Sequence, residues 1–215
     1  MRSGIANIRK EYSQKALLET EVKPDPVEQF DQWWKEAMAA EIEEVNAMTL
    51  ATATADGLPS ARIVLLKDYS EKGFVFFTNY NSFKGKQLAE NPKACLVFFW
   101  KELERQVRIT GFVMKVAGQE SDEYFYSRPV DNRIGASISP QSQVIENRDW
   151  LEHQFNQVKK DKRKVAELKR PEHWGGYLVR PVMIEFWQGR PGRLHDRIEY
   201  TITDSGEWKI ERLAP

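Results

Sequence analysis

Three strand-like runs joined by very short connections restrict the fold of this 215-residue chain more than any other feature. Residues 48–54, 61–69 and 73–79 are rich in β-branched and aromatic side chains, and the turn sequences Asp56-Gly57 and Glu71-Lys72-Gly73 separate them. Connections this short join antiparallel neighbours, because a parallel pair requires a crossover of about a dozen residues or more. The chain therefore begins its sheet as an antiparallel meander.

The rest of the chain alternates further strands with helices. Strands are expected at 93–100, 105–116, from 177 onward and at 208–213, and helices at 27–45, 82–91, 119–127 and 148–164. At least six strands joined mostly by short turns predict an antiparallel barrel in a mainly β protein with flanking helices (α+β). The polar residues 1–25 are expected to form a mobile arm, followed by a single domain over residues 26–215.

Composition and motifs exclude several classes of function. Lys plus Arg and Asp plus Glu both total 32, so bulk electrostatics do not favour a nucleic-acid partner. The single cysteine, Cys95, excludes an internal disulfide and a Cys/His zinc site. Neither a signal peptide nor an apolar run of about 18 residues is seen, so we expect a cytoplasmic protein. The histidines lack metal-ligand spacing, and no glycine-rich phosphate fingerprint or GxSxG motif occurs, which leaves a cofactor-borne reaction on an anionic substrate.

The run Arg193-Leu194-His195-Asp196-Arg197 is the first candidate site. If it is extended, Arg193, His195 and Arg197 lie on one face of a strand. Two guanidiniums beside an imidazole suit a planar anion, because Arg both forks onto oxyanions and stacks on rings. The alternative is a solvated cationic edge strand, and the spacing alone does not decide between them.

Two further clusters place cations near predicted strand ends. Arg62 and Lys67 begin and end an apolar strand and, five residues apart, are expected to face opposite ways, toward two ligands or two subunits, unless both merely reach solvent. Thr78, Ser82 and Lys84 stand where a strand ends and a helix begins. That arrangement is either a phosphate cradle or a plain helix cap with solvated lysines.

A fourth cluster follows the helix expected at 119–127. Tyr124 and Arg128, with Asn132 further on, offer a second site for a phosphate group. A packed aromatic stripe explains Tyr124 equally well.

Together these blocks resemble the pyridoxine/pyridoxamine 5'-phosphate oxidase family along nearly the whole chain. The resemblance is carried, in chain order, by residues 9–12, 62–67, 77–79, 105–107, 124 with 127–129, 134–136, 141–142, 174–176, 184–189, 193–197 and 211–215. So many ordered matches are far more specific than any single motif. The resemblance implies a split β-barrel homodimer with FMN bound across the subunit interface.

The resemblance also assigns a role to each candidate residue. The FMN contacts implied for one subunit are Arg62, Ile63, Val64, Leu65, Leu66, Lys67, Phe77, Thr78 and Lys84. The set that completes the flavin site, largely from the partner, is Gln106, Gln141, Ser142, Trp187 and Arg197. The implied contacts to the substrate phosphate are Lys67, Tyr124, Arg128 and Asn132. Arg193 and His195, the catalytic candidates, would flank the substrate ring, and Arg9 and Tyr12 of the arm would close over it.

The implied reaction converts pyridoxine 5'-phosphate and pyridoxamine 5'-phosphate to pyridoxal 5'-phosphate. A hydride passes from the C4' carbon of the substrate to flavin N5, and O2 reoxidises the flavin to give H2O2, with ammonia released from the amine. Two alternatives stay open. One is a split barrel that holds FMN or pyridoxal phosphate without turnover, and the other is a different flavin enzyme such as a flavin reductase.

Two positions depart from the family pattern. Phe83 stands where the family has Arg in a Ser-Arg-Lys run that holds the flavin phosphate. One charge-assisted hydrogen bond is worth about 1.5–3 kcal/mol, so its loss would weaken FMN binding about 10- to 150-fold unless Lys86 substitutes. Asn132 replaces a Ser near the substrate phosphate, and since both donate a hydrogen bond the change is expected to be mild.

Overall fold

The computed structural model describes Gly4, Asn7 and residues 10–215, and in this part of the chain nine strands form one antiparallel sheet. The strands are β1 (Ala47–Ala53), β2 (Pro59–Leu65), β3 (Asp68–Ser70), β4 (Gly73–Asn79), β5 (Lys93–Trp100), β6 (Arg105–Lys115), β7 (Trp174–Gln188), β8 (Asp196–Ile202) and β9 (Trp208–Arg212). The helices are α1 (Pro26–Ala39), α2 (Phe83–Glu90), α3 (Gly118–Ser127), α4 (Val130–Ile138), α5 (Arg148–Lys160) and α6 (Lys162–Ala166), with 3-10 turns η2 (Lys101–Leu103) and η3 (Pro191–Arg193).

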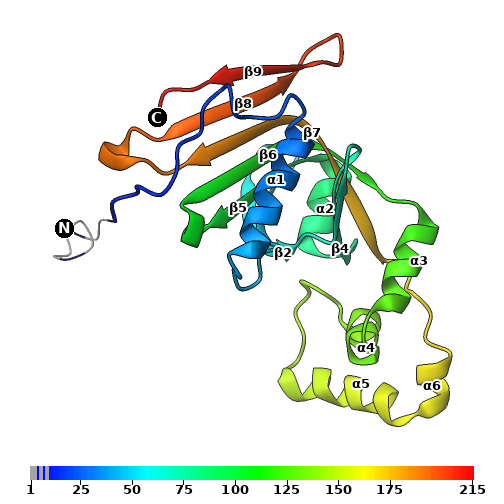
Figure 1. Cartoon of the computed structure of the whole chain (residues 1–215). Helices are drawn as coiled ribbons and strands as arrows, with labels where there is room; N and C mark the ends of the chain where they lie inside the picture. Colours follow the sequence, from blue (N-terminus) through cyan, green and yellow to red (C-terminus); the bar gives the residue numbers. More distant parts are fainter. Residues whose placement is uncertain (1–3, 5–6, 8–9) are drawn as a thin grey trace.

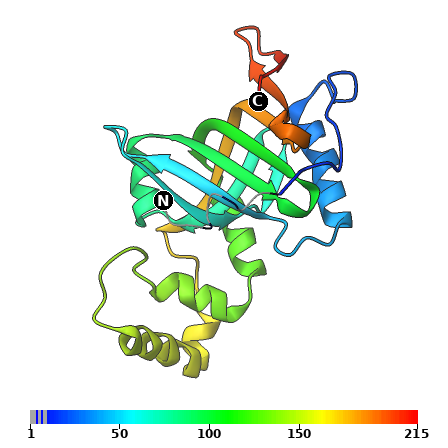
Figure 2. The same cartoon turned by 90° about the vertical axis from the view of Figure 1, so that its left-hand side faces the viewer.

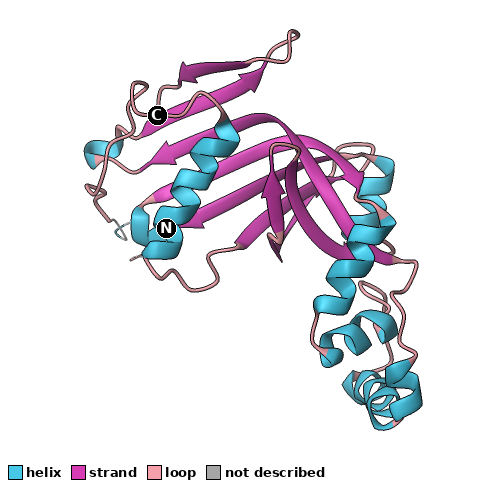
Figure 3. Cartoon of the chain, turned by 45° about the vertical axis from the view of Figure 1, so that its right-hand side comes forward, coloured by secondary structure: helices cyan, strands magenta, loops and turns pink. Residues whose placement is uncertain are grey.

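The long strand β7 is where the sheet divides. The main path of neighbours runs β2-β1-β5-β6-β7-β4-β3, and β6 pairs with β7 along its whole length. The other edge of β7 is shared, because residues 174–179 pair with β4 and residues 183–188 pair with β8. The path from β2 to β4 curls back on itself, so that its two ends meet. There the amide of Lys67, just after β2, donates to the carbonyl oxygen of Val75 on β4 at 2.9 Å. The expected antiparallel split barrel is thus confirmed (Figures 1 and 3).

A β-bulge bends the central pair of strands. The register between β6 and β7 shifts between Thr110 and Gly111. A Cβ on Gly111 would lie 2.1 Å from the carbonyl oxygen of Arg180, so only glycine permits this close approach of the two backbones.

The core is aromatic, and α1 covers it. Asp25 caps α1 by accepting hydrogen bonds from the backbone amides of the first turn. Phe30 on α1 is fully buried and packs against Phe74 and Phe98 of the sheet, with ring centroids 4.9 and 5.3 Å away. The helix ends at Ala39, well before the predicted end near residue 45, because the chain turns through a left-handed conformation at Glu41 (φ 53°).

The helices after β6 differ in detail from the predicted ones. The helix expected at 148–164 is interrupted at Asp161, whose carboxylate caps the short helix α6. Helix α4 has no counterpart in the sequence prediction. Helices α3–α6 lie at one end of the sheet, and the β8–β9 hairpin extends from the opposite end (Figures 1 and 2). Among the described residues, none of the helices combines the length and apolar character needed to cross a membrane.

Candidate functional site

A cavity of about 490 Å³ brings most of the predicted residues together. The residues that line it are Arg62, Ile63, Val64, Leu65, Lys67, Phe77, Thr78, Lys84, Tyr124, Arg128, Asn132, Gln141 and Trp174. All except Trp174 belong to the predicted set, and Trp174 lies in a matching segment to which no role was assigned. The lining holds four cations and no carboxylate, so this cavity, the cationic cavity hereafter, is built for an anionic ligand.

The prediction that Arg62 and Lys67 face opposite ways is wrong. Both line the cationic cavity. The alternation of a strand does not extend to Lys67, because β2 ends at Leu65 and the chain bends into β3. Leu66, by contrast, is 4% exposed in the hydrophobic core and is not among the lining residues.

Lys84 is a buried ammonium whose hydrogen-bond partners are neutral. Its Nζ lies 3.2 Å from Thr78 Oγ1, 3.4 Å from Ser82 Oγ and 3.5 Å from Gln141 Oε1. Burial, and to a lesser degree the positive charge of Arg62, lowers the pKa of Lys84. An anion in the cavity would relieve both effects.

A buried polar network fixes the guanidinium of Arg62. It donates to Thr52 Oγ1 and Ser60 Oγ, each at 2.6 Å, and to the carbonyl oxygen of Leu50 at 3.2 Å. Both hydroxyls in turn donate to Gln87 Oε1 on α2. The network ties the helix that carries Lys84 to the strand that carries Arg62, so the two cations are held in fixed positions.

An aromatic wall closes one side of the cationic cavity. Phe77 stacks on Tyr124 and on Trp174, with centroids 4.0 and 5.6 Å apart. The guanidinium of Arg128 lies 4.7 Å from the Trp174 ring centroid, and its buried Nη1 has no hydrogen-bond partner among the described residues. Burial lowers the pKa of Arg128. A ligand oxygen at Nη1 would supply the missing hydrogen bond.

A second pocket, of about 540 Å³, lies beyond the other end of β7. Its lining residues are Lys10, Glu11, Tyr12, Arg190, Gly192, Arg193 and His195. We call it the arm pocket, because residues 10–12 of the arm form one wall. Trp174 and Gln188 mark the two ends of β7, roughly 45 Å apart along the strand at 3.3 Å per residue. The cationic cavity and the arm pocket of one chain are therefore well separated.

The structure corrects the geometry predicted for residues 193–197. Arg193 belongs to the turn η3 with φ 63°, and β8 begins only at Asp196, so Arg193 and His195 meet through a turn rather than along a strand. Arg197 does not line the arm pocket. It forms a bidentate pair with Glu185, with Nε–Oε1 and Nη2–Oε2 both 3.0 Å, and donates to the Ala214 carbonyl oxygen at 2.7 Å.

His195 is held as a neutral imidazole. Its ring packs on Trp187 and Tyr12, with centroids 4.6 and 5.9 Å away, and Nδ1 accepts the backbone N–H of Arg190 at 3.1 Å. Burial and the charge of Arg193 lower the pKa of His195, which Asp196 partly offsets. At neutral pH its Nε2 therefore carries the proton and is a hydrogen-bond donor.

The remaining predicted residues are placed as follows. Gln106 of β6 is the cross-strand partner of Trp187, and Trp187 is the partner of Arg197 on β8, so these three are neighbours at the end of β7. Ser142 is exposed with φ 69° and lines neither pocket. Arg9 lies outside the described residues.

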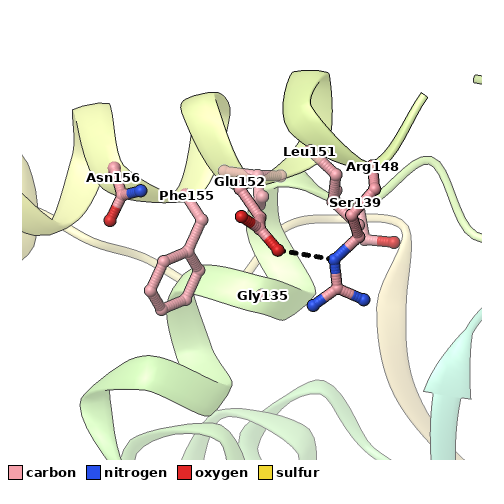
Figure 4. A pocket seen from close by; sticks show the side chains of 8 residues that line it. Gly135, Ser139, Arg148, Leu151, Glu152, Phe155 and Asn156 are labelled. Carbon is pink, nitrogen blue, oxygen red and sulfur yellow. Dashed lines mark hydrogen bonds and ion pairs between the residues drawn. The ribbon is translucent and has the colours of Figure 1, made fainter. Parts of the chain in front are cut away.

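A third cavity, of about 600 Å³, lies between α4 and α5 and contains none of the predicted residues. Leu151 and Phe155 supply its apolar wall, and an ion pair between Arg148 and Glu152 crosses its rim (Figure 4).

Glu185 is a residue of the site region that the sequence did not single out. Its side chain is 2% exposed, and its carboxylate pairs with Arg108 on β6 as well as with Arg197 on β8. The three residues come from adjacent strands, so only the sheet register reveals the cluster. Glu185 fixes the guanidinium of Arg197.

Glu185→Gln is expected to lower the free energy of unfolding by about 2 kcal/mol, because two guanidiniums lose a charged acceptor. Urea unfolding of the variant measures this. The matched control is Glu199→Gln, which removes a half-buried carboxylate on the adjacent strand that carries no ion pair among the described residues. Equal, small losses in both variants would show that the cluster contributes nothing to stability.

Comparisons with known proteins identify the family of this chain. A family described as "Pyridoxamine 5'-phosphate oxidase" matches residues 34–161, and one described as "Pyridoxine 5'-phosphate oxidase C-terminal dimerisation region" matches residues 174–215. Proteins named pyridoxine/pyridoxamine 5'-phosphate oxidase from Trichormus variabilis and Salinibacter ruber are 56% and 54% identical. The first alignment covers 100% of both chains, and the second covers 99% of this chain and 100% of the relative.

Two solved structures share the fold. PhzG from Burkholderia lata, in complex with tetrahydrophenazine-1-carboxylic acid, is 29% identical with a TM-score of 0.86, over 94% of this chain and 100% of that one. An FMN-binding protein related to pyridoxamine 5'-phosphate oxidase, from Nostoc punctiforme, is 16% identical with a TM-score of 0.72, over 90% and 100%. The chain therefore belongs to the pyridoxamine 5'-phosphate oxidase family.

Proposed function

We propose that the protein is an FMN-dependent oxidase that converts pyridoxamine 5'-phosphate and pyridoxine 5'-phosphate to pyridoxal 5'-phosphate. O2 is the electron acceptor, and the products include H2O2 and, from the amine, ammonia. One observation carries the proposal: the cationic cavity combines four cations, no carboxylate and an aromatic wall, in a chain whose full-length relatives carry the oxidase name.

The residues of the cationic cavity fit a flavin phosphate and a substrate phosphate. Thr78 and Lys84 meet at the N-terminus of α2, where backbone N–H groups and the helix dipole also favour an anion, and Arg62 is near enough to lower the pKa of Lys84. Arg128 and Lys67 lie elsewhere in the same lining, and the buried, unsatisfied Nη1 of Arg128 suits a second phosphate. Two anionic groups in one cavity account for the four cations.

A homodimer completes the site in this proposal. Gln106, Trp187 and Arg197, together with the arm pocket, lie at the opposite end of β7 from the cationic cavity, so a partner chain would have to bring them to it. The match of residues 174–215 to a dimerisation region supports this arrangement. Gln141 differs from the expectation, because it lies in the cationic cavity of its own chain, 3.5 Å from Lys84 Nζ.

The residues of the cationic cavity would hold FMN, and the flavin would supply the redox chemistry between the substrate and O2. The protein binds, orients and polarises the substrate. Lys67, Tyr124, Arg128 and Asn132 hold its phosphate, and the partner's arm pocket receives the ring. Arg193 supplies a guanidinium for the ring substituents, and the neutral His195 donates a hydrogen bond from Nε2. Charges and hydrogen-bond donors that are already in place before the substrate binds are the contribution of the protein to the rate in this proposal.

A second candidate function is a flavin enzyme that acts on a substrate without phosphate. The observation in its favour is the similarity to PhzG, whose structure holds tetrahydrophenazine-1-carboxylic acid.

The experiment that tests the proposal is to purify the protein, record its flavin absorbance, and supply pyridoxamine 5'-phosphate in air while following pyridoxal 5'-phosphate and H2O2. Unphosphorylated pyridoxamine is the matched control substrate, because it lacks only the group that Arg128 and Lys67 would bind. A yellow protein that forms neither product would contradict the oxidase in favour of a carrier, and equal turnover of the two amines would contradict the assigned phosphate site.

A further inference from the structure

Residues 10–17 of the arm run past the end of β7, where Tyr12 packs on Gly189, and residues 10–12 form one wall of the arm pocket. Two carboxylates of the barrel accept backbone N–H groups from this segment. Asp196 Oδ2 accepts the amide of Leu17 at 3.0 Å, and Glu104 accepts two amides farther toward the N-terminus. Neither carboxylate belongs to the predicted catalytic or binding residues.

Glu104, the residue just before β6, contacts the arm through its carboxylate and the end of β7 through its carbonyl oxygen. Its Oε2 accepts the backbone amides of Ser13 at 2.8 Å and Gln14 at 3.2 Å, and its Oε1 lies 3.4 Å from Lys10 Nζ. Its own carbonyl oxygen accepts the amide of Gly189 at 2.7 Å and the side-chain amide of Gln188 at 3.2 Å. The side chain is only 3% exposed. One residue thus joins the arm to the end of β7.

The backbone of Glu104 is in a conformation that suits other residues better. Its φ is 55°, in the left-handed region that favours glycine and asparagine. A residue in this conformation persists where the surrounding contacts hold it, and the side chain and the carbonyl oxygen of Glu104 both make such contacts. The amides of Gln14 and Ser13 and the ammonium of Lys10 hold the pKa of Glu104 below its ordinary value, although burial acts against them. The carboxylate is therefore charged at neutral pH.

The clamp places Tyr12 over the arm pocket. The ring of Tyr12 meets Trp187 edge-on at 5.8 Å and lies 5.9 Å from His195, centroid to centroid. It packs directly on Gly189, where an added Cβ would be 2.7 Å from Tyr12 Cβ. Glu104 holds both sides of the contact between Tyr12 and Gly189. Its carboxylate binds the amides of the two residues that follow Tyr12, and its carbonyl oxygen binds the amide of Gly189.

We propose that Glu104 is a positioning residue, which fixes Tyr12 over His195 and Arg193 and so sets the affinity of the arm pocket for the substrate ring. This inference rests on the proposed function, because it takes the arm pocket as the place of the substrate ring. Asp196 holds Leu17 and the Glu102 carbonyl oxygen holds the Gln14 side chain independently, so loss of the Glu104 charge loosens residues 10–13 and leaves the rest of the arm attached.

The test compares Glu104→Gln with Glu102→Gln in the FMN-loaded protein. Glu102 is the matched control, because it is exposed in the adjacent turn and contacts Gln14 only through its main-chain carbonyl oxygen. Hydrogen exchange of the peptide spanning residues 10–17 is expected to be about tenfold faster in Glu104→Gln, and unchanged in Glu102→Gln. Glu104→Asn, which tolerates the left-handed backbone but is too short to reach the arm, is expected to behave like Glu104→Gln and serves if the latter folds poorly.

A kinetic measurement separates positioning from a merely structural role. The KM for pyridoxamine 5'-phosphate is expected to rise about tenfold in Glu104→Gln while kcat stays within about twofold. If Glu104 acts through Tyr12, the double variant with Tyr12→Ala has the same KM as Tyr12→Ala alone. Unchanged exchange in Glu104→Gln, or faster exchange with an unchanged KM, would overturn the proposal. Absence of turnover in the wild-type protein would contradict the proposed function instead. Hydrogen exchange of residues 10–17 would still decide whether Glu104 holds the arm.

Discussion

Arg193→Ala is expected to lower kcat for pyridoxamine 5'-phosphate at least about 100-fold while the FMN content of the purified protein stays nearly unchanged. The size is that of removing one preorganised hydrogen-bond donor that stabilises the charge developing in the transition state. Arg193 lines the arm pocket with His195 and does not line the cationic cavity proposed for the flavin. Alanine also carries a Cβ, so the strain at φ 63° is the same in both proteins and the fold is not the cause of the loss.

Two further variants control this measurement. Arg193→Lys keeps the charge but loses the planar fork, so its kcat is expected to lie between those of the wild type and the alanine variant. Arg190→Ala removes a neighbouring guanidinium that is paired with Asp196 at 3.5 Å, while its backbone N–H still binds His195, and a much smaller effect is expected. If Arg193→Ala lost flavin and turnover in equal measure, the assignment of Arg193 to the substrate would be wrong.

Phe83→Arg is expected to tighten FMN binding by about 10- to 150-fold, the equivalent of one charge-assisted hydrogen bond of about 1.5–3 kcal/mol. Phe83 is the first residue of α2, directly after the Ser82 cap and before Lys84, and its side chain is 52% exposed. An arginine is therefore accommodated without repacking of the core. Titration of apoprotein with FMN, followed by quenching of the flavin fluorescence, gives the Kd.

The controls for Phe83→Arg test whether Lys86 replaces the arginine that the family has at position 83. Lys86 is exposed, and two residues along a helix turn it about 200° away from Lys84, whereas Phe83 stands at the N-terminal end of α2 beside the Ser82 cap. Lys86→Ala and Phe83→Ala are accordingly expected to leave the Kd unchanged. An unchanged Kd in Phe83→Arg would contradict the phosphate site, and a large loss in Lys86→Ala would show that this lysine does replace the missing arginine.

Local patterns in the sequence predicted much of the sheet. Short turns and alternating residues located β1, β4, β5 and β6, and Ser82 together with Asn91-Pro92 marked both ends of α2. The prediction failed where the chain leaves a regular period. The strand expected at 61–69 is two strands with a bend at Leu66 and Lys67, and the extended run expected at 193–197 is largely a turn. A left-handed backbone at Arg193 leaves no periodic signal, because only the surrounding contacts stabilise it.

The site was predictable as a set of residues but not as an arrangement. The family resemblance predicted Lys84 and eleven other residues that line the cationic cavity. It did not show that Leu66, predicted with them, lies in the core instead. Glu185 and Glu104 escaped notice because a lone glutamate has no local signature. Their roles depend on partners 77 and 91 residues away in the sequence, Arg108 and Ser13. Interactions of that range exist only once the sheet has formed.

The division of β7 between two neighbours has a further consequence for how this protein would behave in a cell. In the proposed dimer each chain carries the phosphate-binding half of one site at one end of the strand and the ring-binding half of the other site at its far end. A single chain then contains half of each of two sites and no complete active site. Turnover per chain would consequently follow the law of mass action, falling when the protein is diluted below the dissociation constant of the dimer and recovering on concentration.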